Sequence, residues 1–456
     1  MKTENFLFLL LVAVIAIQLV TFNVNTSFTW DEAVYLSVAE SLAQGKDYGY
    51  VGGRNVESFR PPLFPYALAG VYYLFGINIA IAQIFVSILF IASVAIFYKT
   101  ARIFYSEKIS LLATLFLATN HLVIFFSNRI FVEMLTLLLI ITSFYFFLRM
   151  RKDKRFFIPL AAVLTLAILT RYNLFSVAII YLIYVLVFER ALLKKLLTSQ
   201  YFVIGILVSL LIAYPFFDFI LKSPDIILGS PQLKFEKFEF PVSYFLYFWV
   251  LPLFFTPFFI YGIYKFSKSR KKSLQDKFSI VFILLFLVIN GLVLSSFRYL
   301  IPVLPFIALF TFTFFEKMQK KFLAIILIAS FLNMVTGYAV TYLFINPVQG
   351  FEQLPTFIEI RSYFSEGLDR KNAALYIKDS TEENETVMTN AYAWLWLYTK
   401  RNWIPMGDTE EEFLSNIGKY NVRYIYSDGP LPDFAQNKTC IKKVLSGHAD
   451  VYKIEN

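Results

Sequence analysis

The sequence predicts an all-α membrane domain of about eleven transmembrane helices, followed by a small α/β domain at the C-terminal end. The first observation is composition: of 456 residues, 58% are hydrophobic and 19% aromatic, more than soluble domains usually contain. The second is that apolar runs long enough to cross a bilayer recur up to about residue 345. The third is the polar, mixed-charge character of residues 346–456. Together these observations indicate a polytopic membrane protein.

Apolar runs give the position of each predicted span. The first run has no clear small-x-small cleavage site, so we expect it to stay as a helix and not to act as a cleaved signal peptide. The two runs around Arg171 could form one long tilted helix, but their outer flanks are both strongly basic and should lie on the same side. We therefore expect a hairpin with "TRYN" (170–173) at its tip. The spans are expected near residues 5–22, 79–98, 109–126, 130–148, 156–170, 174–189, 200–221, 243–264, 278–294, 299–315 and 322–345.

Lysine and arginine are distributed unequally between the predicted loops. Basic clusters at "RMRKDKR" (149–155), "ERALLKK" (189–195), "KFSKSRKKSLQDK" (265–277) and "EKMQKK" (316–321) all fall on one side of the predicted membrane domain. Positive residues favour the cytoplasmic side. The sequence therefore predicts an integral protein of the cell membrane, with its N-terminus in the cytoplasm and its C-terminal domain outside. Because the net charge of +10 comes from these loops, no nucleic-acid partner is predicted.

Residues 346–456 have the mixed pattern of a small α/β domain. "TVMTNAY" (386–392) and "RYIYSD" (423–428) are typical of strands, and "FLSNIGKYNV" (413–422) is typical of a helix that leads into the second strand. The length is sufficient for a domain with its own core. We therefore divide the chain into a membrane domain, 1–345, and an extracytoplasmic domain, 346–456. The first outer loop, about 23–78, belongs to the membrane domain in this division and should contain amphipathic helices.

A group of polar residues interrupts apolar surroundings at or near the predicted outer leaflet. Ionisable groups at such depths are costly unless they are paired or face a water-filled cavity, so their shared side predicts one polar cavity open to the outside. Arginines would bind a phosphate and stabilise charge on it as it departs, and a carboxylate would take the proton from an attacking hydroxyl. This mixture suits transfer of a group from an anionic lipid-linked donor. The residues are Asp31, Glu32, Arg60, Arg129, Glu133, Arg171, Arg298 and Tyr299.

Several stretches resemble the GT-C glycosyltransferases of the protein O-mannosyltransferase and aminoarabinose-transferase superfamily. They are "DEAVYLSVAESLAQGKDY" with "SFRPPLFPYAL" in the first outer loop, "FSNRIFVEM" (126–134), "LTRYN" (169–173) and "FRYLIPVLPF" (297–306). They occur in the order of the family and on the same predicted side. The resemblance implies the GT-C architecture and an integral-membrane glycosyltransferase. Such an enzyme moves a sugar from a polyprenyl (dolichyl or undecaprenyl) phosphate donor, with inversion, to a hydroxyl of a protein, lipid or glycan acceptor on the outer face.

The resemblance also implies roles for individual residues. Asp31 matches the acid that acts as the catalytic base. Its neighbour Glu32, the second member of the predicted catalytic pair, is structural or positions the acceptor. Arg60 matches the basic residue before two prolines, near the lipid phosphate. Glu133 matches the second-loop acid that positions the acceptor or supports the base. The other residues assigned to substrate binding are Arg129, Arg171, Arg298 and Tyr299.

Each of these motifs also has a purely structural interpretation. Asp31 and Glu32 could cap the helix that follows them, Arg60 could be an ordinary interfacial residue, and Glu133 could favour the dipole at a helix start. Two other functions fit the composition. A transporter or flippase of lipid-linked sugars would spread its charges through the membrane depth, whereas here they gather on one side. A non-catalytic subunit that binds lipid-linked sugars would lose little when Asp31 is replaced.

The sequence leaves open whether a divalent metal takes part. One cysteine and two histidines are too few for a cysteine- or histidine-based metal centre. Aminoarabinose transferases carry a glutamate directly before the basic residue of the first-loop motif, where it helps to hold a metal, and here Phe59 occupies that position. We therefore name no metal ligand and expect no other cofactor. The expected partners are the lipid-linked donor, the acceptor and membrane lipids.

Overall fold

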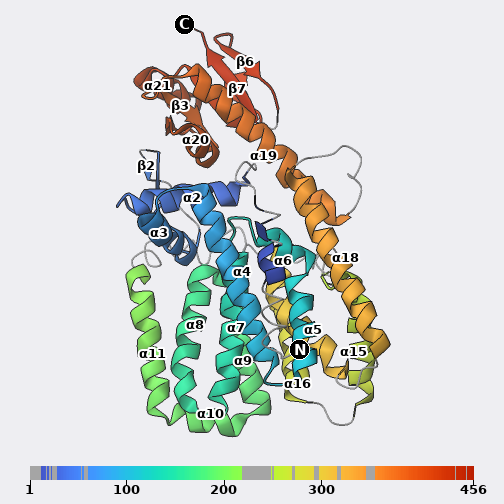
Figure 1. Cartoon of the computed structure of the whole chain (residues 1–456). Helices are drawn as coiled ribbons and strands as arrows, with labels where there is room; N and C mark the ends of the chain where they lie inside the picture. Colours follow the sequence, from blue (N-terminus) through green and yellow to red (C-terminus); the bar gives the residue numbers. More distant parts are fainter. Residues whose placement is uncertain are drawn as a thin grey trace. The chain divides into compact units, whose positions relative to one another are not determined.

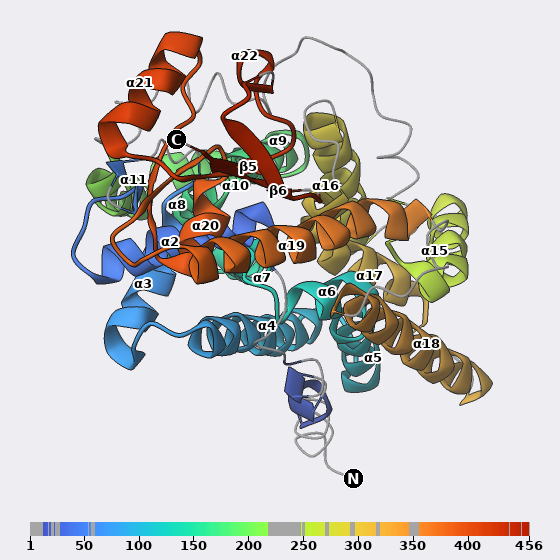
Figure 2. The ribbon, with the colours of Figure 1, turned by 90° about the horizontal axis from the view of Figure 1, so that it is seen from above.

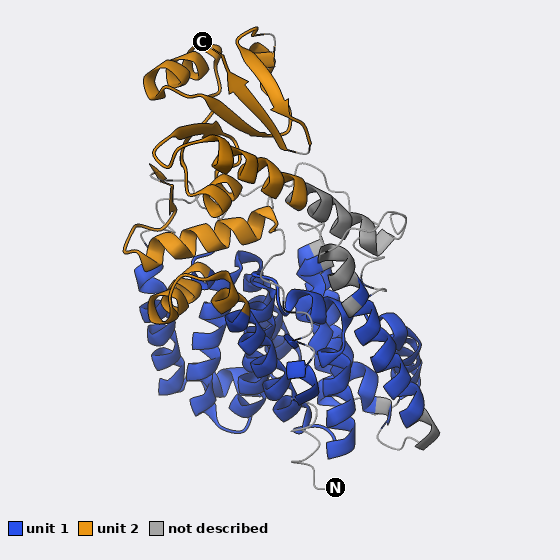
Figure 3. Ribbon diagram, turned by 45° about the horizontal axis from the view of Figure 1, so that its top comes forward, with its two compact units in different colours: residues 1–22, 59–64, 84–341 blue, residues 23–58, 65–83, 342–456 orange. Residues whose placement is uncertain are grey.

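The computed structural model is mostly helical, and its chain forms two compact units (Figures 1 and 3). Residues 1–22, 59–64 and 84–341 form unit 1, and residues 23–58, 65–83 and 342–456 form unit 2. The structure describes residues 12–16, 18–19, 22, 28–52, 54–55, 60–217, 248, 251–269, 273–291, 297–315, 320–345, 355–436, 438–447 and 449–455.

Unit 1 is built of helices that follow the apolar runs of the sequence. The spans predicted near 79–98, 130–148, 156–170 and 174–189 correspond to α4, α7, α8 and α9. In chain order the helices are α4 (Ile79–Ala101), α5 (Glu107–Ala118), α6 (His121–Phe126), α7 (Glu133–Met150), η1 (Lys154–Phe156), α8 (Phe157–Thr170), η2 (Tyr172–Leu174), α9 (Phe175–Phe188), α10 (Arg190–Leu197), α11 (Gln200–Ala213), η3 (Tyr214–Phe216), η4 (Leu253–Phe255), α15 (Thr256–Lys268), α16 (Leu274–Gly291), η5 (Phe297–Val303), α17 (Leu304–Phe312), η6 (Thr313–Phe315) and α18 (Lys320–Ile345).

Polar residues and prolines break the helices of unit 1 at defined points. Asn120 separates α5 from α6, because its side-chain oxygen accepts a hydrogen bond from the Leu122 N–H at 3.1 Å and caps α6. Pro302 lies inside the 3-10 helix η5, which α17 follows. Arg171 ends α8 with an extended backbone, φ −152° and ψ 122°. The two apolar runs beside Arg171 therefore form separate helices, as the hairpin interpretation predicts.

These breaks shorten the helices. Among the described residues, two helices are long and apolar enough to cross a membrane alone, Ile79–Ala101 and Glu133–Met150. A third is obtained if the pair Tyr172–Phe188 and Arg190–Leu197, bent by 114°, is taken as one span. The predicted number of about eleven spans thus stays a prediction. Most of the first predicted span, 5–22, lies outside the described residues, as does the beginning of the span predicted near 243–264.

Unit 2 contains a five-stranded sheet with strand order β4-β3-β5-β7-β6. Strands β3, β4 and β5 are parallel, and β7 runs antiparallel to both β5 and β6. Both strand predictions and the helix prediction in this part of the chain are confirmed. The elements are α19 (Pro355–Ser380), β3 (Thr386–Thr389), α20 (Tyr392–Thr399), β4 (Asn402–Ile404), α21 (Glu410–Tyr420), β5 (Tyr424–Asp428), α22 (Asp433–Gln436), β6 (Ile441–Leu445) and β7 (Ala449–Ile454).

Alternating residues of the strands send their side chains into two separate cores. Val387 of β3 and Val451 of β7 belong to a core shared with α19 and α20, whereas the next residues, Met388 and Tyr452, belong to a core shared with α21 and α22. This is the period of two expected for a strand buried on both faces. Figure 2 shows α19 and α20 on one side of β5 and β6, and α21 and α22 on the other.

The first core of unit 2 also contains the segment predicted as the first outer loop. This segment carries α2 (Trp30–Ala43), the strands β1 (Tyr50–Val51) and β2 (Arg54–Asn55), and then α3 (Leu63–Phe75). Every residue of α2 from Glu32 to Ser41 is buried, so α2 is not the amphipathic helix that the sequence suggested. The reason is that α2 packs on α20 and β1. The unit boundaries thus differ from the predicted division at residue 345, because unit 2 includes this loop.

Candidate functional site

An ion pair buried in unit 1 joins two of the predicted site residues. Glu133 is the first residue of α7, and Arg171 follows the last residue of α8. The Arg171 Nη2 lies 2.7 Å from the Glu133 Oε1, and the two side chains are 10% and 0% exposed. The second carboxylate oxygen of Glu133 is also buried, and it has no hydrogen-bond partner among the described residues. Glu133 therefore orients the guanidinium of Arg171 and keeps one acceptor atom available for a polar group.

Tyr299 lies against the same guanidinium. The Arg171 guanidinium carbon is 4.5 Å from the centroid of the Tyr299 ring, and that of Arg298 is 5.2 Å from the same centroid. Arg298 also lies 5.6 Å from the ring centroid of Phe131, a residue that the sequence reasoning did not single out. Cations over aromatic faces are attracted by the ring quadrupole. The structure thus brings Glu133, Arg171, Arg298 and Tyr299 together into one cluster, which we call the arginine cluster.

Arg129 and Arg60 are the other predicted binding residues of unit 1. Arg129 is buried, and it lies between α6 and α7, two residues before Phe131. Arg60 is half-buried and is followed by Pro61 and Pro62, directly before α3. The prolines fix the backbone next to Arg60. The roles of Arg60 and Arg129 in substrate binding stay predictions.

A network of polar side chains that the sequence reasoning missed holds the segment before Arg129. The Gln18 Nε2 donates to the Ser127 Oγ at 2.6 Å. The Ser87 Oγ lies within hydrogen-bonding distance of two acceptors, the Gln18 Oε1 at 2.9 Å and the Asn128 Oδ1 at 2.8 Å. All four side chains are buried. These residues could have been identified from the sequence as polar residues inside apolar runs, because such residues need hydrogen-bond partners in a membrane.

Asp31 and Glu32 lie in the first turn of α2, within unit 2. Thr29 is the N-cap, and the Glu32 Oε2 accepts hydrogen bonds from the Thr29 N–H at 3.0 Å and from its hydroxyl at 3.2 Å. This is a capping box, which satisfies N–H groups at a helix start. Asp31 is half-buried. The structural interpretation of the acidic pair therefore accounts for Glu32, whereas the carboxylate of Asp31 takes no part in the capping box.

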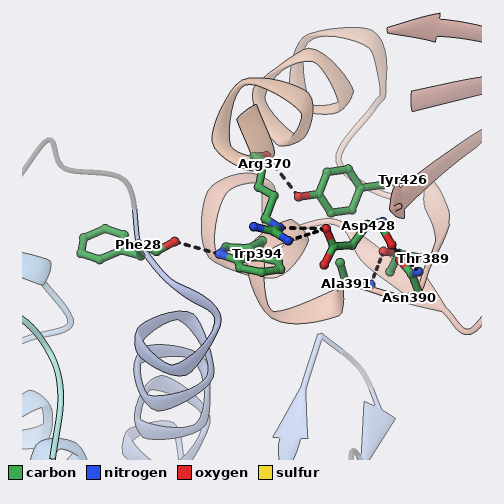
Figure 4. Close-up of polar contacts among 8 residues, drawn as sticks. All are labelled: Phe28, Arg370, Thr389, Asn390, Ala391, Trp394, Tyr426 and Asp428. Atoms are coloured by element: carbon green, nitrogen blue, oxygen red, sulfur yellow. Dashed lines mark hydrogen bonds and ion pairs between the residues drawn. The ribbon is translucent and has the colours of Figure 1, made fainter. Parts of the chain in front are cut away.

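Residues of the C-terminal segment hold the chain just before Asp31 (Figure 4). The indole N–H of Trp394, in α20, donates to the Phe28 carbonyl at 2.9 Å. The guanidinium of Arg370 lies 4.3 Å from the centroid of the Trp394 ring and is fixed by an ion pair to Asp428 at 2.7 Å. Together these contacts connect β5 to the N-terminal end of α2. Within unit 2, the sheet therefore fixes the turn that carries Asp31.

No metal centre is evident from the arrangement of side chains. Among the residues that the structure describes, no group of three or more His, Cys, Asp or Glu side chains is placed to hold a metal ion. The buried carboxylate of Glu133 is paired with Arg171.

Comparisons with known proteins agree with this arrangement of helices and sheet. ArnT from Cupriavidus metallidurans, solved with undecaprenyl phosphate, matches with a TM-score of 0.72 over 98% of this chain and 97% of its own, at 13% identity. This chain has the GT-C glycosyltransferase fold. The Archaeoglobus fulgidus oligosaccharyltransferase has the same fold, with a TM-score of 0.61 at 11% identity over 94% of this chain and 69% of its own. Arabinofuranosyltransferase AftD from Mycobacteria matches with a TM-score of 0.55 at 13% identity, over 100% of this chain and 42% of its own.

Sequence comparison finds a family resemblance in the first half of this chain. Residues 59–217 match the model of the Dolichyl-phosphate-mannose-protein mannosyltransferase family. The matched region contains Arg60, Arg129, Glu133 and Arg171. A comparison with curated proteins finds no match.

Proposed function

We propose that this protein is an integral-membrane glycosyltransferase that moves a sugar from a polyprenyl phosphate to a hydroxyl acceptor on the outer face. The observation that carries the proposal is the arginine cluster, in a fold that ArnT shares and in which ArnT binds undecaprenyl phosphate. Arginine donates paired hydrogen bonds that match the oxygens of a phosphate. Because Glu133 and Tyr299 hold the guanidinium of Arg171, little conformational entropy would be lost when it binds such a group.

The proposed reaction is a direct displacement at the anomeric carbon. The acceptor hydroxyl oxygen forms the new bond to this carbon while the bond from the carbon to the phosphate oxygen breaks, and its electron pair stays on the phosphate. Attack from the opposite side inverts the configuration. Asp31 takes the hydroxyl proton, and Arg171 and Arg298 stabilise the negative charge that grows on the polyprenyl phosphate. The carboxylate oxygen of Glu133 that is not bonded to Arg171 is suited to accept a hydrogen bond from the acceptor.

A transfer assay tests the proposed function. Purified protein is incubated with a panel of radiolabelled polyprenyl-phosphate sugars and with hydroxyl acceptors from proteins, lipids and glycans. Transfer of label to an acceptor supports the enzyme and identifies the donor. Movement of labelled donor across a vesicle membrane without transfer would instead support a flippase. Donor binding with neither activity would support a binding subunit.

The proposed orientation, with an extracytoplasmic C-terminal unit, can be tested without introducing a label site. Cys440 is the one cysteine of the sequence, and it is exposed. We expect a membrane-impermeant maleimide to label Cys440 in intact cells or spheroplasts. As a control, a Lys152→Cys, Cys440→Ser variant places the thiol in a predicted cytoplasmic loop and should be labelled only after permeabilisation. The opposite pattern would show that the orientation is reversed.

A second prediction concerns Trp394, which we propose as a positioning residue for Asp31. Trp394→Phe keeps an aromatic ring but removes the hydrogen bond to Phe28, so the turn before Asp31 should shift. We expect kcat to fall about ten- to a hundredfold, with the KM for the donor unchanged, because small errors in placement are costly in catalysis.

Trp403 offers a matched control for this variant. Its indole N–H donates to the Val51 carbonyl, also at 2.9 Å, beyond the other end of α2. Trp403→Phe should lower thermal stability about as much as Trp394→Phe, by about 1 kcal/mol for one hydrogen bond, and should leave kcat nearly unchanged. Equal losses of kcat in the two variants would show that Trp394 contributes only to the general stability of unit 2.

A further inference from the structure

A basic cavity lies in unit 1 among residues that have no part in the proposed reaction. Its volume is about 470 Å³. It is lined by two short segments, one from the last residue of α7 to Lys154 and one from Glu189 to Lys195 of α10. The charged residues that line it are Arg151, Lys152, Lys154, Glu189 and Lys195.

An ion pair holds the two segments together. The Arg151 Nε lies 2.9 Å from a carboxylate oxygen of Glu189, so Glu189 neutralises Arg151. Within the described part of the chain, no carboxylate forms an ion pair with Lys152, Lys154 or Lys195. The cavity is therefore a hollow with an excess of positive charge, and its chemistry suits a phosphate group.

The helices around the cavity place it at the edge of an apolar zone. Helix α10 connects α9 to α11, at one end of the group formed by α7, α8, α9 and α11 (Figure 1). Large apolar side chains are exposed on α9 and α11, including Leu186, Leu207 and Leu211. In a membrane protein such side chains contact acyl chains. Leu186 precedes Glu189, a residue that lines the cavity, by less than one helical turn, so exposed apolar side chains adjoin the cavity.

Helix α10 has the features of a helix that lies in a membrane surface. It is bent away from α9 by 114°. Leu196 is buried against the protein, Leu197 is 52% exposed, and Arg190 and Lys194 are exposed, so this short helix presents both an apolar and several basic side chains to its surroundings. Short helices of this composition rest at the level of the lipid headgroups.

We propose that this cavity binds the phosphate headgroup of an anionic membrane lipid. The positive charge selects a phosphate, and the surface helix and the adjoining apolar zone favour a lipid over a free phosphate ion. Basic pockets between membrane helices are known to accept anionic lipid headgroups in this way. The site is separate from the arginine cluster, and the proposal goes beyond the proposed sugar transfer.

Native mass spectrometry of the full-length protein, released from nanodiscs of defined composition, tests the lipid site. We expect phosphatidylglycerol to remain bound to the protein and phosphatidylcholine to be lost. A Lys154→Gln, Lys195→Gln variant removes one positive charge from each lining segment, and we expect its affinity for phosphatidylglycerol to fall about tenfold or more. A Lys194→Gln, Lys108→Gln variant loses the same charge at exposed positions outside the cavity and should bind as the wild type does.

The outcomes separate a lipid site from its alternatives. Equal loss of lipid in the two double variants, or equal retention of the two lipids, would overturn the proposal. Displacement of phosphatidylglycerol by inorganic phosphate at millimolar concentration would show a site for free phosphate and would also overturn it. Melting temperatures of both variants in detergent establish that each is folded. Because the readout is lipid binding, failure of the proposed sugar transfer would leave the result interpretable.

Discussion

Replacing Asp31 with asparagine is expected to lower kcat for sugar transfer by about 10²- to 10⁴-fold, the usual contribution of a general base. The amide has nearly the size of the carboxylate but cannot take the proton of the attacking hydroxyl. The fold should survive the change, because Glu32 and Thr29 provide the capping box of α2. Loss of one negative charge in a first helical turn costs only about 0.3–1 kcal/mol.

Transfer of labelled sugar, donor binding and thermal unfolding should be measured on the same preparation of Asp31→Asn. Binding of the polyprenyl phosphate should persist, since the proposed phosphate ligands are arginines. Asp47→Asn is a matched control: Asp47 is exposed, lies in the loop after α2, and should be replaceable without loss of transfer. A general base usually contributes at least about a hundredfold to the rate. If Asp31→Asn retained more than about a tenth of wild-type kcat, Asp31 would therefore not be the base.

The positions of individual helices could be predicted from the sequence because they depend on local hydrophobicity. The run expected at 79–98 became α4, and "RYIYSD" became β5. Local pattern could not show which elements pack together. The hydrogen bond from Trp394 to the Phe28 carbonyl joins residues that are 366 positions apart. For this reason the burial of α2 in the core of unit 2, and with it the unit boundary, could not be predicted.

The candidate site was partly predictable for a different reason. Charged residues within apolar sequence must find partners, so Glu133, Arg171 and Arg298 could be expected to gather. The structure places both arginines against the Tyr299 ring and Glu133 against Arg171. The specific pairing of Glu133 with Arg171 depends on where α7 begins and α8 ends, which sequence reading places only to within a few residues. Phe131 was missed because a phenylalanine next to apolar residues has no distinguishing signal.

The pairing of Glu133 with Arg171 leads to the second large expected effect. Glu133→Gln would leave a buried guanidinium without its counter-charge, so we expect the free energy of unfolding to fall by about 3–5 kcal/mol. Circular dichroism of the helices in detergent would follow the thermal unfolding of the helical unit 1. For comparison, Glu189→Gln breaks the ion pair with Arg151, in which the arginine side chain is 34% exposed. That change should cost no more than about 1 kcal/mol.

A double variant then separates the structural role of the pair from its role in transfer. Arg171→Leu with Glu133→Leu removes both charges and fills the space with apolar atoms, and such replacements are often neutral or stabilising. We therefore expect the double variant to unfold near the wild-type temperature, unlike Glu133→Gln. If Arg171 binds the donor phosphate, the double variant should lose both donor binding and transfer although it is stably folded. Recovery of transfer together with stability would show that the pair only holds α7 against α8, and the phosphate would then need another ligand.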